Sequence, residues 1–272
     1  MSTLKRWMGL GLGAALIAGC TPAAEADKAA EGTPTTARQM GAGPGEGGGE
    51  GGESGEGGVD VAAAATDPVV YLTALAVVEA HVRAAAAAAA AGERQAAGEM
   101  FAHPVSEVLL DMAPTFTRLG VAPFDAEFSA ASAAVFDGAA VPALQARADG
   151  LLRTLDQAGD RAPADGADDT GVAARVIADL IDRAALQYGT AGASSDYEPY
   201  LDGYGFYVTA KAWRDARVEA LRREAPEALA AIDAALTALA SAYPGAARPE
   251  TLTADGGALM AAASRVRLAT TR

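Results

Sequence analysis

Cysteine and histidine are scarce in this chain. Among its 272 residues there is one cysteine, Cys20, and there are two histidines, His81 and His103. A single thiol excludes an intrachain disulfide, and it cannot supply the several cysteine ligands of an iron–sulfur cluster. Two imidazoles exclude a three-histidine zinc site, so a metal site in this chain has to use carboxylates as well.

Positive charge is also in short supply. The chain carries 21 Lys and Arg against 35 Asp and Glu, which gives a net charge of −14. Nucleic-acid phosphates are bound by clustered Lys and Arg, so this composition argues against a nucleic-acid partner. Anionic lipid head groups would repel the chain for the same reason.

Strand patterns and familiar catalytic motifs are absent from the sequence. No segment shows the apolar–polar alternation of a half-buried strand. No glycine-rich loop follows a strand, no Gly-x-Ser-x-Gly elbow occurs, and the aspartates lack the spacing of a calcium loop. The sequence therefore gives no positive sign of an enzyme, and we expect binding in preference to catalysis.

The first twenty residues carry the most specific pattern that is present. Lys5 and Arg6 precede an apolar run over residues 7–17, which is too short to span a bilayer as a helix. The run ends in Ile17-Ala18-Gly19-Cys20, and this layout is typical of a secretory signal peptide. Its end resembles the lipobox of bacterial lipoproteins, which implies that residues 1–19 are removed and that Cys20 carries acyl chains such as palmitate. The alternative is an ordinary signal peptide in which Cys20 is incidental.

Residues 20–66 are predicted to be a tether between the lipid and a folded domain. Gly41 to Gly58 is mostly glycine with interspersed glutamates, and such a segment cannot bury enough apolar surface to stay ordered. Thr21 follows the cysteine, where an aspartate would signal retention in the inner membrane. We therefore expect a lipid-anchored protein of the cell envelope, on the periplasmic side of the outer membrane.

Residues 67–272 are predicted to form one all-α domain, an antiparallel bundle of about seven or eight helices with short loops. Proline near a helix start and glycine after its end mark most boundaries. A solenoid of helical hairpins is the less favoured alternative. The expected helices are 69–91, 93–119 with an interruption at His103-Pro104, 123–136, 142–158, 171–188, 198–224, 226–243 and 258–268.

His81 is the first candidate for chemistry. Helical spacing places it among alanines and valines on an apolar face, whereas Glu79 should lie on another face and pair with Arg83. A buried imidazole needs a hydrogen-bond partner or a metal ion. The simpler interpretation is a core histidine that bonds to a tyrosine hydroxyl or a backbone carbonyl.

His103 is the second candidate. Glu99, His103 and Glu107 recur every four residues, which would put two carboxylates and an imidazole on one helix stripe suited to a divalent metal. Pro104 disfavours helical geometry at His103, however, and could break the stripe. In that case Glu99 and Glu107 would be ordinary solvated charges.

The two histidines are expected to meet. Each lies eleven residues from Gly92, so in a helical hairpin they stand at the same height. With Glu107 they would bind a divalent ion such as Zn, Cu, Fe or Mn. A third wall could come from tyrosines on one face of the later helix, namely Tyr200, Tyr204 and Tyr207, although three such tyrosines more often serve packing.

The segments Glu99-x-x-x-His103-Pro104-x-x-Glu107 and Tyr-x-Asp-x-Tyr-Gly-Phe (residues 200–206) resemble a group of exported helical bacterial proteins without an established function. A fainter likeness is to imelysin-like periplasmic proteins, which are helical bundles tied to iron uptake. Their His-x-x-Glu signature is absent, because Ala84 and Ser106 stand three residues after the two histidines. The expected function is thus metal binding by an anchored bundle. The alternatives are an envelope scaffold that docks a protein partner without metal or catalysis and, less favoured, an enzyme with a histidine proton relay.

Overall fold

The computed structural model describes residues 60–271, and this part of the chain contains helices and no strand. The predicted all-α bundle is confirmed. If α3, the π-helical turn η1 and α4 are counted as one continuous segment, the described residues form eight long helical segments and the short α1. The elements are α1 (Val61–Ala64), α2 (Pro68–Ala91), α3 (Arg94–Pro104), η1 (Val105–Leu109), α4 (Leu110–Leu119), α5 (Asp125–Phe136), α6 (Val141–Gly159), α7 (Asp169–Ala193), α8 (Glu198–Glu224), α9 (Pro226–Ala242) and α10 (Gly256–Thr270).

Local sequence signals explain the ends of α2. The Asp67 carboxylate accepts hydrogen bonds from the backbone N–H groups of Val69 and Val70, and Pro68 occupies the first helical position, where no donor is needed. At the other end Gly92 adopts a left-handed conformation with φ of 90°, which an L side chain would resist. These caps fix where the α2–α3 hairpin turns.

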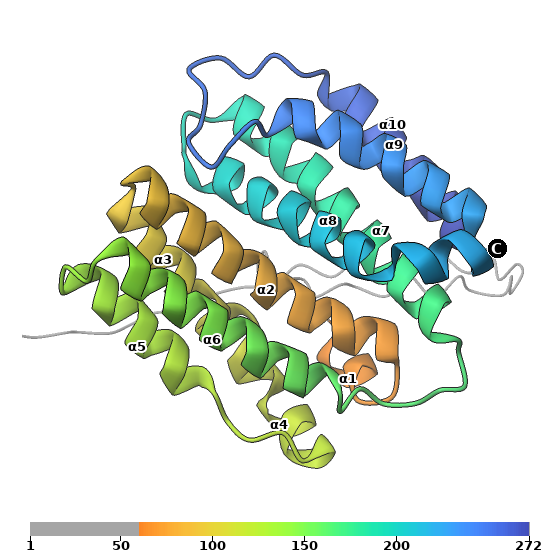
Figure 1. Cartoon of the computed structure of the whole chain (residues 1–272), viewed down its shortest axis with the longest axis horizontal. Coiled ribbons are helices and arrows are strands. Elements are labelled where there is room, and N and C mark those ends of the chain that lie inside the picture. The colour runs from red at the N-terminus through yellow and green to blue at the C-terminus, as the bar shows by residue number, and fades with distance from the viewer. Residues whose placement is uncertain (1–59, 272) are drawn as a thin grey trace, which may run out of the picture. The chain divides into compact units, whose positions relative to one another are not determined.

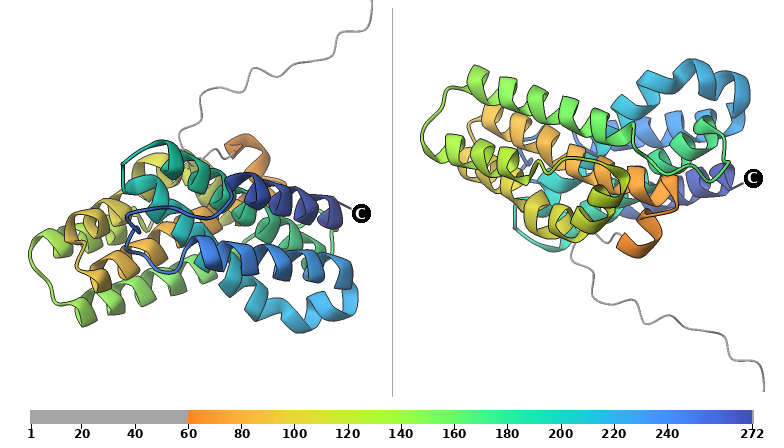
Figure 2. Two further views of the ribbon diagram at one scale, coloured as in Figure 1. Left: turned by 90° about the horizontal axis from the view of Figure 1, so that it is seen from above. Right: turned by 90° about the horizontal axis from the view of Figure 1, so that it is seen from below.

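α2 is the central helix of the bundle. It contacts α1, α3, α6, α7 and α8, and it lies between α3–α6 on one side and α7–α10 on the other (Figure 1). The same division is seen from above and below (Figure 2). By length and composition α2 could cross a membrane, but 72% of its most apolar window is buried inside the bundle. Burial on nearly all faces is what a core helix of this composition requires.

Glycines let α8 approach its neighbours closely. A Cβ atom at Gly205 would lie 2.5 Å from the carbonyl oxygen of Ala80 in α2. A Cβ atom at Gly203 would lie 1.8 Å from the hydroxyl oxygen of Tyr243. Both distances are far inside van der Waals contact, so these two positions require glycine. The close packing brings one face of α8 against the middle of α2.

The expected interruption at His103-Pro104 is replaced by a π-helical turn. α3 runs through Pro104 and continues as η1, in which the N–H of Leu110 donates to the carbonyl of Val105, five residues back. Proline removes one N–H from the ladder, and a wider turn absorbs the defect without breaking the helix. His103 and Glu107 therefore stay on one continuous helical segment.

The folded part begins earlier than the sequence suggests. α1 falls inside the range expected for the tether, and the Asp60 carboxylate caps it by accepting from the Ala63 N–H. Ala64 is fully buried, and the Arg118 guanidinium donates to the carbonyl of Ala65. The predicted signal peptide, the acylation site at Cys20 and the glycine-rich segment lie outside the described residues.

Tyrosine hydroxyls connect helices across the bundle. Tyr71 on α2 donates to the carbonyl of Ala158 on α6, and Tyr243 donates to the carbonyl of Ala184 on α7, at 2.8 and 2.7 Å. Burial raises the pKa of Tyr71 to about 12 and also raises the pKa of Tyr243. The hydroxyls consequently remain donors over the neutral pH range.

Candidate metal centre

His81 lies in the middle of α2 with 6% of its surface exposed, as its helical face predicts. Its Nδ1 is 2.9 Å from the carbonyl oxygen of Val77, one turn earlier. A carbonyl oxygen can only accept, so Nδ1 is the donor in this contact, and Nε2 is the ring nitrogen left to face other groups. A backbone carbonyl that orients the imidazole in this way is the usual outer partner of a metal-ligating histidine.

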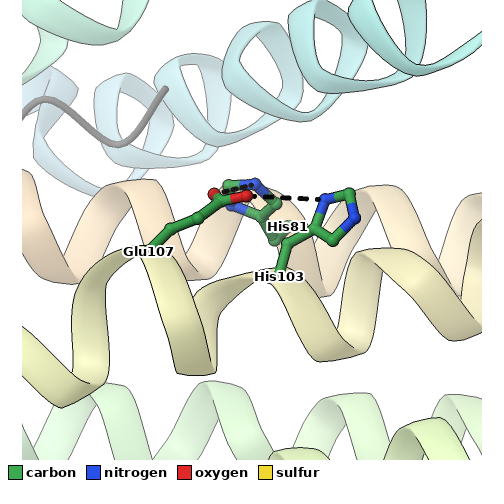
Figure 3. Close-up of side chains that lie close together, drawn as sticks. All are labelled: His81, His103 and Glu107. Atoms are coloured by element: carbon green, nitrogen blue, oxygen red, sulfur yellow. Dashed lines mark ion pairs between the residues drawn. The ribbon is translucent and has the colours of Figure 1, made fainter. Parts of the chain in front are cut away.

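His103 and Glu107 meet His81 from the neighbouring helical segment (Figure 3). Glu107 Oε2 is 3.5 Å from His81 Nε2, Glu107 Oε1 is 3.8 Å from His103 Nδ1, and the ring centroids of the histidines are 6.1 Å apart. One ligand atom from each residue can be chosen so that all three lie within 4.8 Å of one another. The structure thus brings these three predicted residues together, and we call them the His–His–Glu cluster.

Two carboxylates from α8 complete the surroundings, and their place in the site was not predicted. Asp202 Oδ1 lies 3.8 Å from His81 Nε2, and Glu198 Oε1 lies 3.4 Å from His103 Nδ1. The ring of Phe206 packs edge-on against His81, with centroids 6.3 Å apart. The sequence contains a pattern that indicates this face of α8, because Glu198, Asp202 and Phe206 recur every four residues on one helix.

The His–His–Glu cluster, together with Asp202 and Glu198, has the negative charge expected of a cation site. Three carboxylates surround two imidazoles, and Glu107 Oε2 is buried with no hydrogen-bond partner. Burying such an oxygen without compensation is costly. The nitrogen–oxygen separations of 3.4–3.8 Å are longer than hydrogen bonds. They are close to the separation of roughly 3.3–3.6 Å between two ligands of one tetrahedral zinc ion.

Glu99 is not part of the cluster. Its side chain is exposed and accepts a hydrogen bond from the Gln95 amide on the same helix. It is the one member of the predicted stripe that the structure leaves in solvent.

The predicted tyrosine wall is replaced by the acidic face of α8. Tyr200 donates to the carbonyl of Gly245, Tyr207 stacks on Tyr243, and Tyr204 packs edge-on against Tyr207. These contacts run toward the loop after α9, because the tyrosines occupy a different face of α8 from the site-facing Asp202. They serve packing, as the alternative interpretation held.

Fold and site together define an all-α bundle with a half-buried histidine–carboxylate cluster where α2, the continuous α3–η1 segment and α8 meet. No known protein-family model, curated protein or solved structure matches the chain. The geometry of the site itself is therefore the basis for a functional assignment.

Proposed function

We propose that this protein binds a divalent first-row transition-metal ion through His81, His103 and Glu107. The observation that carries the proposal is the arrangement of Glu107, whose two carboxylate oxygens lie 3.5 and 3.8 Å from a nitrogen of one histidine each. A cation between these groups would compensate the buried Oε2 of Glu107 and could be ligated by Nε2 of His81. The chain offers no other group of this kind among its described residues.

The donor set narrows the choice of ion. Imidazole nitrogen suits Zn, Cu and Fe, and added carboxylate oxygen extends the range to Mn. No cysteine lies among the described residues 60–271, so the cluster has no thiolate that would favour a soft ion such as Cu(I). Zn, Cu, Fe and Mn in their divalent states are therefore the ions to test.

The first experiment measures the thermal stability of the purified full-length chain with and without each ion. An ion that binds only the folded state raises the melting temperature in proportion to its concentration relative to Kd. We expect such a rise for the wild type, and its loss in Glu107→Gln and in His103→Ala. Both variants change partly exposed side chains, so both should still fold.

Glu99→Gln is the matched control. Glu99 lies on the same helical segment as Glu107 and loses the same charge, but it stands outside the cluster. This variant should respond to metal as the wild type does. The proposal is wrong if none of the four ions shifts the wild-type melting temperature, or if Glu107→Gln responds as fully as Glu99→Gln.

The place of action is a separate proposal that depends on the sequence. We propose anchoring in the cell envelope through lipid on Cys20, with the bundle facing the periplasm. The role that fits both proposals is the capture or handling of a metal ion at the envelope. A scaffold that docks an envelope protein is the role left if the metal test fails.

A further inference from the structure

We infer that the cluster holds two metal ions, an inner and an outer one, which share Glu107 as a bridging carboxylate. This inference rests on the proposed function and extends it to α8, whose Asp202 and Glu198 would each ligate a different ion. Its basis is the way in which four side chains, His81, Asp202, His103 and Glu198, divide around the two oxygens of Glu107.

The inner position is formed around His81. Nε2 of His81 faces Glu107 Oε2 at 3.5 Å and Asp202 Oδ1 at 3.8 Å. Asp202 is 3% exposed and His81 is 6% exposed. One nitrogen and two carboxylate oxygens converge there from α2, η1 and α8, in an environment that excludes most water.

The outer position is formed around His103. Its Nδ1 faces Glu107 Oε1 at 3.8 Å and Glu198 Oε1 at 3.4 Å. His103 is 24% exposed and Glu198 is 53% exposed, so solvent reaches this side. The outer set repeats the inner one, with one imidazole, one α8 carboxylate and one oxygen of Glu107.

Glu107 is the element that the two sets share. Each of its oxygens is directed to a different histidine, which is the arrangement of a carboxylate that bridges two ions (Figure 3). Two-metal sites in proteins hold their ions roughly 3.5–4 Å apart. A single ion bound by His81, His103 and Glu107 would not use as ligands the two α8 carboxylates that face these histidines, Asp202 and Glu198.

The ions at the two positions should differ in how fast they exchange with solvent. The inner ion would be enclosed by buried side chains, including the edge of Phe206. The outer ion would be held partly by Glu198, at the first residue of α8, where the side chain is half exposed. We expect a chelator to remove the outer ion faster than the inner ion.

The test counts ions per chain. The full-length protein is loaded with Mn(II), freed of excess ion by gel filtration, and analysed by elemental analysis and electron paramagnetic resonance. We expect two ions per wild-type chain with a spin-coupled signal. Glu198→Gln should retain one ion with an uncoupled signal. Glu219→Gln is the matched control, because it alters another exposed glutamate of α8 and should retain two.

The possible failures are distinguishable. One ion per wild-type chain, with no change in Glu198→Gln, overturns the two-ion inference and leaves the proposed function standing. No bound ion in the wild type, with Mn(II) or with Zn(II) in a parallel loading, overturns both. Loss of both ions in Glu198→Gln while the variant keeps its helical circular dichroism also overturns the division into an inner and an outer set.

Discussion

At the scale of single residues, the site depends on the absence of a side chain. Gly205 allows the backbone of α8 to touch the backbone of α2 at Ala80, next to His81. Asp202 and Phe206 reach His81 only because the two helices are this close. A glycine inside a helix weakens its intrinsic stability, so its use here indicates a packing requirement.

Gly205→Ala should therefore destabilise the fold. Its Cβ would lie 2.5 Å from a backbone oxygen, which cannot rotate away, so the helices must separate. We expect a loss of about 1–3 kcal/mol in the free energy of unfolding, the usual range for overpacking a core. Denaturant unfolding followed by circular dichroism measures it.

Gly192→Ala provides the comparison for that variant. Gly192 is an exposed helical glycine of α7, and a Cβ there would meet nothing within 4 Å. Alanine should leave stability unchanged or raise it by up to about 1 kcal/mol. Equal effects of the two substitutions would show that helix propensity, and not the α2–α8 contact, decides the outcome.

At the scale of helical elements, the π turn η1 sets the direction of Glu107. A π turn holds one residue more than an α turn, so it rotates everything after it relative to everything before it. α3 and α4 both pack on neighbours, and the extra residue is accommodated between them. Such π turns are frequent at functional sites.

Deleting Ser106 should convert η1 into an ordinary α-helical turn. The registers of α3 and α4 on their neighbours can both survive, so the melting temperature and helical content should stay near the wild-type values. Glu107 would move to the exposed position that Ser106 now holds, and the metal-induced rise in melting temperature should disappear.

Ser106→Ala tests whether the hydroxyl matters instead. The Ser106 hydroxyl donates to the carbonyl of His103 at 3.3 Å, but the substitution keeps the residue count. Metal binding should persist in this variant. A deletion variant that folds and still responds to metal would show that the π turn does not position Glu107.

At this scale, some helix ends follow from local sequence signals and others depend on tertiary contacts. Asp67, Pro68 and Gly92 predicted the ends of α2 because their effect is local. The helix expected to end at residue 188 continues to Ala193 as α7, through Gly189 and Gly192. Proline at 104 suggested a break, and only the surrounding contacts decide that a wider turn forms instead.

The residues of the site also differ in whether local sequence spacing or tertiary packing decides their position. The meeting of His81 and His103 followed from equal distances to Gly92, because a hairpin converts sequence spacing into height. Asp202 could not be assigned to His81 from its own helix, because its position depends on how α8 packs against α2. The tertiary contact, not the motif, selects which face of α8 becomes functional.

At the scale of the whole molecule, the net charge and the proposed lipid anchor would act in opposite directions on membrane binding. The net charge of −14 opposes binding to anionic membranes, so surface attachment would have to come from acyl chains on Cys20. Acyl chains supply membrane affinity through buried methylene groups, and this affinity resists salt.

Cys20→Ser should release the exported protein from the membrane fraction or leave it unprocessed. Cell fractionation with a high-salt wash measures the distribution of the wild type and the variant. His103→Ala serves as the control for a substitution in the bundle and should fractionate like the wild type. Membrane association of Cys20→Ser equal to that of the wild type, after the salt wash, would contradict the lipoprotein interpretation.

The origin of the ligands on three helices has a consequence for how the protein would acquire its metal. His81, Glu107 and Asp202 converge only after α8 has docked on α2, so the unfolded chain has no coordination sphere. A chain exported in an unfolded state would leave the cytoplasm without cargo and would fold among the ions of its destination. Selectivity among these divalent ions depends on ligand geometry and on which ions are available more than on affinity alone. The supply of ions in the compartment where the chain folds would therefore determine which metal it binds.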